Sequence, residues 1–305
     1  MNNFPRLVRT TLPSSVRVET GGGRLPRLAV RTPTAEADVY FQGAQVTAWR
    51  PASSRDPVLW LSGQSRFEPC QPIRGGVPLC FPWFSRHATD RSAPPHGFAR
   101  TREWTLELAR HGADGTVELD MELAGDALSP QWPHRFRARL RIAVGATLRL
   151  DLDVTNDGAS AFAFEEALHA YFDVGDVRRV TLSGLEGLAF QDKAGGKPAA
   201  GDGGMSAPDL APLRFAGLTN RVYPGARGSC TIHDAARGRD IVIRKAGSGS
   251  TVVWNPWAER AREMDDFGDD EWTGMLCVEP ANVGADAVTL GPGESHTMTV
   301  AIEVR

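Results

Sequence analysis

Residues 147–156 read TLRLDLDVTN and are the clearest structural signal in this chain. Apolar and polar side chains alternate along them with a period of two residues, the apolar ones being Leu148, Leu150, Leu152 and Val154. Such alternation places the leucines and the valine on one face and the charged residues on the other. The segment is therefore predicted to be a half-buried strand of an antiparallel sheet.

Similar short runs, separated by Gly, Asp, Asn and Pro, continue from one end of the chain to the other. They cover residues 28–32, 37–43, 45–51, 57–62, 102–111, 116–125, 135–145, 178–185, 229–234, 239–247, 250–256, 274–280 and 295–305. Only Ala207 to Phe215 and Pro256 to Phe267 indicate a helical turn. Many strands with few helices predict an all-β protein, a large antiparallel β-sandwich or barrel.

Length and composition limit the class of protein. At 305 residues, with 41% hydrophobic residues and a net charge of -3, the chain resembles an ordinary globular protein, and we expect one domain. The arginines are spread along the sequence, which argues against nucleic-acid binding. Four cysteines at no metal-ligand spacing are expected to be reduced core thiols, and no apolar run has the length of a signal peptide or membrane span. We therefore expect a cytoplasmic protein that does not bind membranes.

The stretch from Arg74 to Arg102 has the composition of a binding site. It reads RGGVPLCFPWFSRHATDRSAPPHGFARTR and combines Arg74, His96 and Arg100 with glycines, prolines and aromatics. The prolines and glycines exclude a helix, so the polar residues are expected on loops or strand ends whose backbone is fixed locally.

Two further titratable residues lie in predicted strands far along the chain. His169 in EEALHAYF shares a strand face with Ala167 and Tyr171, and Glu279 in MLCVEP lies in an otherwise apolar strand. A carboxyl group in apolar surroundings has a raised pKa and accepts protons better near neutral pH. The alternatives are a buried core histidine and a strand-end carboxylate that pairs with an arginine.

Two segments are predicted to be surface loops. Gly195 to Pro208 is too rich in Gly, Ala and Pro to pack and is expected to be a mobile excursion. Glu259 to Glu271 is strongly acidic, and it is expected to be solvated rather than to bind a cation because it lacks the spacing of a calcium loop.

Five motifs together resemble one family. RGGVPLCFPWFS, PPHGFARTREW, EEALHAYFDVGDV, WNPW and CVEPANV occur in the order found in the hexose-6-phosphate mutarotases, also called glucose-6-phosphate 1-epimerases, of the aldose 1-epimerase superfamily. The resemblance implies a galactose-mutarotase-like β-sandwich over residues 21–305, preceded by an N-terminal extension of residues 1–20. It also implies an enzyme without metal or organic cofactor that interconverts the α and β anomers of a phosphorylated aldohexose. We expect a monomer.

The resemblance also implies roles for individual residues. Glu279 would be the base that takes the proton of the C1 hydroxyl, and His169 the acid that protonates the ring oxygen. Arg74 and Arg100 would bind the 6-phosphate, to which a guanidinium is well matched. His96 and Asn220 would contact the sugar.

This chain departs from the family pattern at two positions. Pro95 replaces the glutamine that commonly precedes HGF, and Asn220 replaces the aspartate of a TDR segment. Both changes put the preferred sugar in doubt. Two other functions therefore stay open, a mutarotase for unphosphorylated aldoses and a non-catalytic sugar-binding module. A metal-dependent lyase or isomerase is disfavoured because no close pair of histidine ligands occurs.

Overall fold

The computed structural model describes residues 6–112, 114–195 and 204–305, and it confirms an all-β, antiparallel architecture. The largest sheet has nine strands. In spatial order these are β16 (Leu213–Arg214), β13 (Val180–Ser183), β18 (Cys230–Asp234), β19 (Arg239–Ala246), β23 (Ser295–Val304), β9 (Leu148–Asn156), β8 (Arg135–Val144), β7 (Val117–Asp126) and β6 (Thr105–His111).

A second, eight-stranded sheet carries most of the functional residues described below. Its strands are β15 (Met205–Ser206), β14 (Phe190–Asp192), β17 (Thr219–Tyr223), β20 (Ser250–Asn255), β21 (Met275–Asn282), β11 (Glu166–Leu168) and β5 (Leu79–Cys80), with β12 (Tyr171–Asp173) paired to β21 as well. Two smaller sheets contain β1 (Val16–Thr20), β2 (Pro26–Arg31), β3 (Ala35–Tyr40) and β4 (Gln45–Pro51), and β10 (Phe162–Phe164) with β22 (Val288–Leu290).

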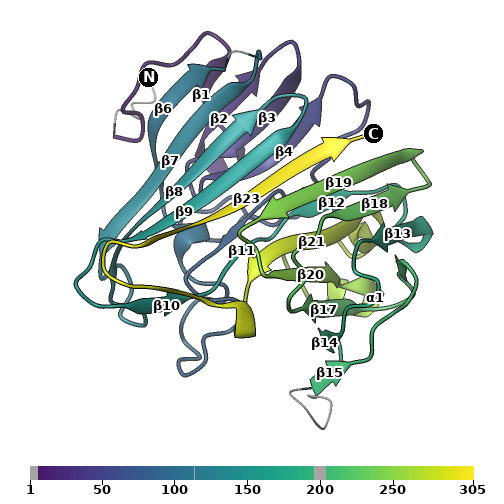
Figure 1. The fold of residues 1–305 in the computed structure, drawn as a ribbon. Helices are drawn as coiled ribbons and strands as arrows, with labels where there is room; N and C mark the ends of the chain where they lie inside the picture. The colour runs from purple at the N-terminus through teal and green to yellow at the C-terminus, as the bar shows by residue number, and fades with distance from the viewer. Residues whose placement is uncertain (1–5, 113, 196–203) are drawn as a thin grey trace.

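The sheets stack as layers around one apolar core. In Figure 1, β7, β8, β9 and β23 run in front of the four-stranded sheet, and β21, β20 and β17 lie below and to the right. The apolar side chains of β9 are buried and alternate with the exposed or partly exposed residues Arg149, Asp151, Asp153 and Thr155, as predicted, whereas Asn156 at the end of the strand is buried. Trp49 of β4 is buried and donates its indole N–H to Gly145 O in the turn between β8 and β9, which ties two layers together.

The helical segments are short. The described ones are α1 (Trp257–Ala261) and the 3-10 turns η1 (Gly22–Arg24), η2 (Ala99–Thr101), η3 (Val177–Arg179), η5 (Glu271–Gly274) and η6 (Gly284–Asp286). The helical turn predicted within Pro256 to Phe267 is confirmed by α1. The one predicted within Ala207 to Phe215 is wrong, because Pro212 cannot donate a helical hydrogen bond and β16 follows it.

Several local predictions need correction. Residues 57–62 form isolated bridges instead of a strand. Within the predicted excursion from Gly195 to Pro208, residues 196–203 lie outside the described residues, whereas β15 is paired with β14. All four cysteines are free thiols, but Cys70 is exposed instead of lying in the core.

The N-terminal residues that the structure describes are joined to the sheets. β1 pairs with β2 across the predicted boundary after residue 20, and Arg9 N donates to Leu106 O. The division into an extension and one domain stays a prediction. In the described part of the chain, every helix is too short or too polar to cross a bilayer.

Candidate active site

The pairing of β11 and β12 with β21 brings His169 beside Glu279. β11 and β12 keep one antiparallel register against β21, with Ala167 opposite Ala281 and Tyr171 opposite Cys277. His169, between the two short strands, therefore falls at the level of Glu279. Nε2 of His169 lies 3.4 Å from Oε1 of Glu279. The second oxygen of this buried carboxyl group makes no hydrogen bond to the described chain.

His169 lies at a break in the sheet. β11 ends at Leu168 and β12 begins at Tyr171, and between them His169 N donates to Pro78 O at 3.0 Å. The imidazole stacks on the Tyr171 ring, with centroids 4.8 Å apart and planes 12° from parallel. The two side chains share a face, as the alternation predicts, and the ring is fixed on that face.

Burial shifts the two pKa values in opposite directions. It raises the pKa of Glu279 well above its usual range, against the opposing effect of Arg100. It also lowers the pKa of His169 to about 3, with smaller contributions from Arg100 and Arg74 in the same direction. The free protein therefore favours a protonated carboxyl beside a neutral imidazole.

His96 lies next to His169 in the same space. Its ring is 5.6 Å from that of His169, and its backbone has a φ of 64°. The next residue, Gly97, has a φ of 74°, and a Cβ there would lie 1.9 Å from Phe81 O. Only glycine fits this position, which lets the His96 loop pack against the backbone of Phe81, directly after β5.

Arg74 is held from two sides. It donates to the Tyr171 hydroxyl at 2.9 Å and to Asp266 at 3.1 Å. Burial works against its charge more than any other single effect, but these two partners outweigh it and the pKa of Arg74 is raised. Asp266 belongs to the acidic segment predicted to be solvated, so that prediction is wrong at this residue.

Arg100 is almost completely buried in η2. It donates to Pro95 O at 2.7 Å, and its Nε has no hydrogen-bond partner among the described residues. Burial is the main reason that its pKa is lowered. Because no carboxylate of the described chain forms an ion pair with it, Arg100 offers a buried positive charge to an anion.

Asn220 reaches the same space from β17. Its backbone carbonyl accepts from Lys193 N at 2.7 Å, and it lies opposite Trp254 of β20. The neighbouring Arg221 points elsewhere, pairing with Asp209 and covering the Phe190 ring. Of these two neighbouring side chains, only the amide of Asn220 is therefore available to a ligand in the cavity.

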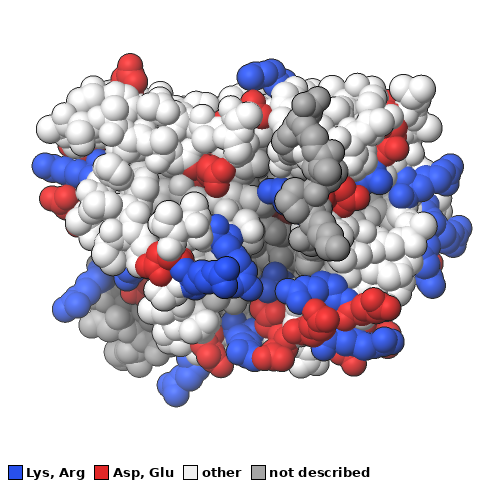
Figure 2. Space-filling model, turned by 90° about the horizontal axis from the view of Figure 1, so that it is seen from below, with Lys and Arg blue, Asp and Glu red and all other residues white. Residues whose placement is uncertain are grey.

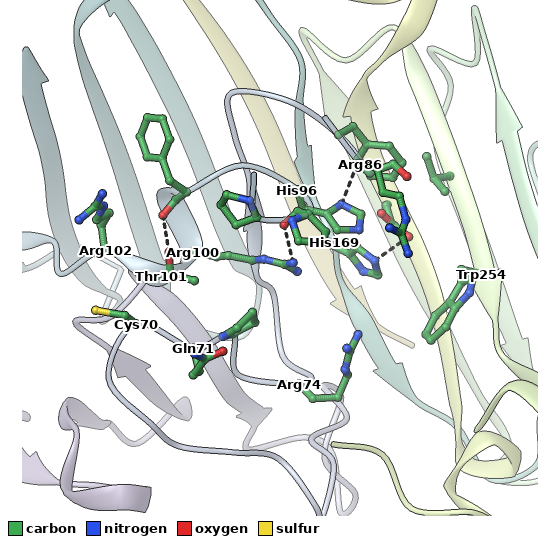
Figure 3. Close-up of a pocket in the computed structure, with 18 of the residues that line it drawn as sticks. Cys70, Gln71, Arg74, Arg86, His96, Arg100, Thr101, Arg102, His169 and Trp254 are labelled. Atoms are coloured by element: carbon green, nitrogen blue, oxygen red, sulfur yellow. Dashed lines mark hydrogen bonds and ion pairs between the residues drawn. The ribbon is translucent and has the colours of Figure 1, made fainter. Parts of the chain in front are cut away.

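All six predicted site residues line one cavity of about 940 Å³, a size suited to a small molecule. Figure 3 shows Arg74, Arg100, His96 and His169 directed toward a common space, with Trp254 at its far side. The sequence analysis assigned no role to Tyr171, Trp254 or Asp266. Tyr171 could have been found from its alternation with His169 and Trp254 from the WNPW motif, whereas no sequence signal linked Asp266 to Arg74.

The outer part of the cavity is basic. Exposed cations that line it are Arg86, Arg102, Lys193 and Arg260. Figure 2, seen from below, shows Lys and Arg side chains gathered around a hollow in this face. Although the whole chain is slightly acidic, this entrance should attract anions.

One group of potential metal ligands overlaps the site. Ligand atoms of His169, Cys277 and Glu279 lie within 4.8 Å of one another. Burial raises the pKa of Cys277, and metal binding requires the thiolate. The positive charge of Arg100 also opposes a cation here. We assign no metal to these residues, and the absence of a cofactor stays a prediction.

Comparisons with known proteins agree on one family. A family model described as aldose 1-epimerase matches residues 26–303. A protein of Cenchrus ciliaris, described as a candidate glucose-6-phosphate 1-epimerase, is 34% identical over 276 residues, which cover 87% of this chain and 80% of the relative. An Escherichia coli relative with the same description is 36% identical over 260 residues, covering 84% of this chain and 83% of the relative.

Solved structures show the same fold. The crystal structure of a candidate mutarotase, YeaD from Salmonella typhimurium, superposes with a TM-score of 0.86 at 31% identity, covering 96% of this chain and 95% of that one. The structure of HI1317 superposes with a TM-score of 0.79 at 26% identity, covering 97% and 98%. The architecture described above is thus shared with proteins of this type over nearly their whole length.

Proposed function

The chain belongs to the aldose 1-epimerase family, and from this premise we propose that it interconverts the α and β anomers of a hexose 6-phosphate. The observation that carries the proposal is the pair of Glu279 and His169, 3.4 Å apart in a cavity that also contains the partly buried Arg74 and the buried Arg100. Two relatives described as candidate glucose-6-phosphate 1-epimerases make glucose 6-phosphate the first substrate to test.

The proposed reaction needs two proton transfers. Glu279 takes the proton of the C1 hydroxyl while His169 delivers a proton to the ring oxygen, so the C1–O5 bond breaks and an open-chain aldehyde forms. Rotation about C1–C2 presents the other face of the aldehyde. Glu279 then returns its proton to O1, His169 recovers its proton from O5, and the other anomer closes.

The protonation of the free protein fits an intermediate point of this cycle. Ring opening leaves a protonated Glu279 and a neutral His169, which is the distribution that burial favours. The closed sugar needs the opposite distribution, a carboxylate and an imidazolium. A bound phosphate would favour the imidazolium by opposing the nearby positive charges of Arg74 and Arg100. The site can therefore reach both distributions when substrate is bound.

Arg74 and Arg100 would contribute to phosphate binding in different ways. Arg100 has no ion-pair partner among the described residues, whereas Arg74 is oriented by Tyr171 and Asp266. A fixed guanidinium binds phosphate oxygens without first losing side-chain freedom. We infer that Arg100 supplies most of the uncompensated charge and that Arg74 supplies directed hydrogen bonds.

The two departures from the family pattern act at the sugar. Pro95 has no polar side chain, and its carbonyl is used to hold Arg100. Asn220 offers an amide that can donate to or accept from a hydroxyl but carries no charge. We infer that Asn220 and His96 contact sugar hydroxyl or ring oxygens, with no contact from residue 95 beyond van der Waals packing.

The test follows the optical rotation of pure α-glucose 6-phosphate and of pure α-glucose as each approaches anomeric equilibrium. We expect the wild-type protein to accelerate the first much more than the second, and Glu279→Gln to lower the rate by about 10³-fold. Glu303→Gln, at a partly exposed glutamate of β23 outside the cavity, is the control. Equal acceleration of both sugars would point to an enzyme for unphosphorylated aldoses. A wild-type rate equal to that of buffer would point to a binding module.

The domain organisation, cellular location and oligomeric state are proposed on other grounds. We propose that residues 21–305 act as one domain and that the protein is a cytoplasmic monomer whose partner is a small sugar phosphate. The four free thiols support a reducing compartment. Sedimentation equilibrium would test the monomer, and a dimer mass would contradict it.

A further inference from the structure

His96 has a hydrogen-bond environment that differs from that of His169. Two groups approach its Nδ1 atom: the backbone N of Ser85 at 3.2 Å and Sγ of Cys80, also at 3.2 Å. Figure 3 shows the His96 ring beside that of His169, with a dashed line from His96 to one of these partners. Nδ1 therefore faces the protein, and the cavity side of the ring is left to Nε2.

The Ser85 contact determines which nitrogen carries the proton. A backbone N–H can only donate, so Nδ1 must present its lone pair, and a neutral imidazole then carries its single proton on Nε2. The loop cannot easily change this arrangement, because His96 N also donates to Ser85 O at 2.7 Å and Phe81 N donates to His96 O. These two backbone hydrogen bonds fix the main chain of His96 to that of Ser85 and Phe81, so the imidazole ring is held in place.

Cys80 adds a second donor. It lies in β5, has no exposed surface, and its burial raises the pKa of the thiol, so the S–H is present and can point at Nδ1. Protonation of Nδ1 would make the Ser85 contact repulsive and would force the Cys80 thiol to rotate and accept instead of donating. Burial lowers the pKa of His96 well below 6.5, and the neighbouring Arg100, His169 and Arg74 act in the same direction.

We propose that Cys80 is a positioning residue which, with the backbone N–H of Ser85, locks His96 as the neutral Nε2–H tautomer, so that His96 serves the sugar only as a hydrogen-bond donor. Among the described residues Nε2 has no hydrogen-bond partner, which leaves it for a substrate oxygen. The acceptor would be O1 or O5, on which negative charge grows as the ring opens. This inference rests on the proposed function for its substrate but not for its tautomer.

The division of labour between the two histidines follows. His169 faces Glu279 and can gain and lose a proton during turnover, whereas His96 keeps its proton throughout. A fixed donor that needs no reorientation stabilises developing charge, and removing one such donor costs about 10²-fold in kcat.

The tautomer can be measured without substrate. Protein labelled with ¹⁵N-histidine should show a two-bond correlation pattern for His96 with a protonated Nε2 and a bare Nδ1, and its nitrogen shifts should stay constant between about pH 5 and about pH 9. His96→Gln identifies its signals. A proton on Nδ1, or a titration near the usual histidine pKa, would overturn the proposal even if the protein is an active epimerase.

Kinetics of glucose 6-phosphate anomerisation separate donation from acid-base catalysis. The amide nitrogen of glutamine can reach the position of Nε2, so His96→Gln should stay within about 10-fold of wild type, whereas His96→Ala should lose about 10²-fold in kcat. The pH profile of His96→Gln should keep the wild-type shape. Equal losses in both variants would contradict a donor role.

The role of the thiol is tested against a matched buried cysteine. Cys80→Ala should lower kcat about 5-fold, and Cys80→Ser, which keeps a donor, should recover most of that loss. Cys230→Ala, in β18 and outside the cavity, is the control and should behave as wild type. If Cys80→Ala matches Cys230→Ala, the thiol does not position His96. If the wild-type protein does not accelerate anomerisation of glucose 6-phosphate but His96 shows the expected tautomer, the proposed substrate is wrong and the tautomer assignment still holds.

Discussion

At the scale of single residues, the role of the Tyr171 hydroxyl can be tested by removing its oxygen atom alone. It accepts from Arg74 at 2.9 Å, while its ring supports His169. Tyr171→Phe keeps the ring and removes the hydroxyl. We expect KM for glucose 6-phosphate to rise about 5-fold, because Arg74 is then held by Asp266 alone, and kcat to change less.

Tyr223→Phe is the matched control. Tyr223 is also a buried tyrosine whose hydroxyl accepts from an arginine, Arg221, but it lies outside the cavity. Steady-state kinetics of both variants give the comparison. The same KM in the two proteins would show that the Tyr171 hydroxyl does not orient Arg74 for substrate.

A second prediction at this scale concerns stability and pH. His169 has a pKa lowered from 6.5 to about 3, chiefly by burial. Above pH 6.5 the ring is neutral in both folded and unfolded chains. As the pH falls below 6.5 the unfolded chain takes up a proton that the folded protein refuses until about pH 3, so stability is lost through this window.

His169→Gln removes this proton uptake. Between about pH 7 and about pH 4.5, the free energy of unfolding of the wild type should fall by about 2 kcal/mol more than that of His169→Gln. Urea unfolding at both pH values measures the difference. His111→Gln, at an exposed histidine, should follow the wild type. Parallel pH dependence in all three proteins would mean that His169 titrates normally.

The contacts between residues could be predicted only in part from sequence. Alternation correctly placed His169 and Tyr171 on one face, and the motifs marked Glu279. That His169 and Glu279 touch depends on the register of β12 against β21, which no local pattern encodes. The pairing of Arg74 with Asp266 joins a loop to a segment far along the chain and had no signal at all.

At the scale of structural elements, the loop that carries His96 depends on Gly97. Gly97→Ala would introduce a Cβ 1.9 Å from Phe81 O at a φ of 74°. The variant should lose about 3 kcal/mol or more of stability and most of its activity, because both strain and a backbone clash must be relieved.

Gly238→Ala is the control, because it introduces the backbone strain of a positive φ without a steric clash. Gly238 has a φ of 61°, but a Cβ there meets nothing within 4 Å, so the cost should be about 1 kcal/mol with activity unchanged. Thermal unfolding and initial rates of the two variants provide the measurement. Similar losses in both would show that the packing of Gly97 on Phe81 is unimportant.

Long strands were predicted better than short ones. β7, β8, β9 and β23 are nine or ten residues long with alternating apolar and polar side chains, and they were found with small boundary errors. Strands of two or three residues, such as β5, β11 and β12, contain too few residues for a period to be visible. These short strands are ordered by their neighbours, and they carry Cys80 and flank His169. The functional part of the sheet was therefore the part least visible in the sequence.

At the scale of the whole molecule, charge is distributed unevenly. The chain has a net charge of -3, yet the cavity entrance is lined by Arg86, Arg102, Lys193 and Arg260. Such a local field raises the association rate of an anion and is screened by salt. The kcat/KM for glucose 6-phosphate should fall about 5-fold when ionic strength rises from about 0.02 M to about 0.2 M.

Variants can test whether the cations at the cavity entrance cause this salt dependence of kcat/KM. Combining Arg86→Ala with Lys193→Ala should flatten the salt dependence, whereas Arg244→Ala, on the exposed side of β19, should leave it unchanged. The kcat/KM for glucose, where measurable, should not depend on salt. A steep salt dependence in the double variant would place the steering charges elsewhere.

The global architecture was accessible from sequence because it depends on many weak and repeated signals. Alternation in the long strands predicted the sandwich, and the motifs placed it in a family. The cationic entrance was not predicted, because Arg86, Lys193 and Arg260 are far apart in sequence and gather only when the loops of different strands meet at one face. Properties of a surface depend on tertiary structure in a way that core periodicity does not.

The placement of Glu279 in β21, and of His169 between the two short strands β11 and β12 that pair with β21, also bears on how this enzyme could be redesigned or could diverge. Their separation is set by backbone spacing within a sheet, about 4.8 Å between neighbouring strands, whereas the cavity walls around Arg86, Pro95 and Gln131 belong to connecting segments. Insertions or substitutions in those segments can select a new sugar without moving the reacting atoms. The fold thus holds the residues that react with the sugar on the sheet and those that select the sugar on the connecting segments. Libraries that vary only the connecting segments should therefore change substrate preference and keep the epimerase chemistry.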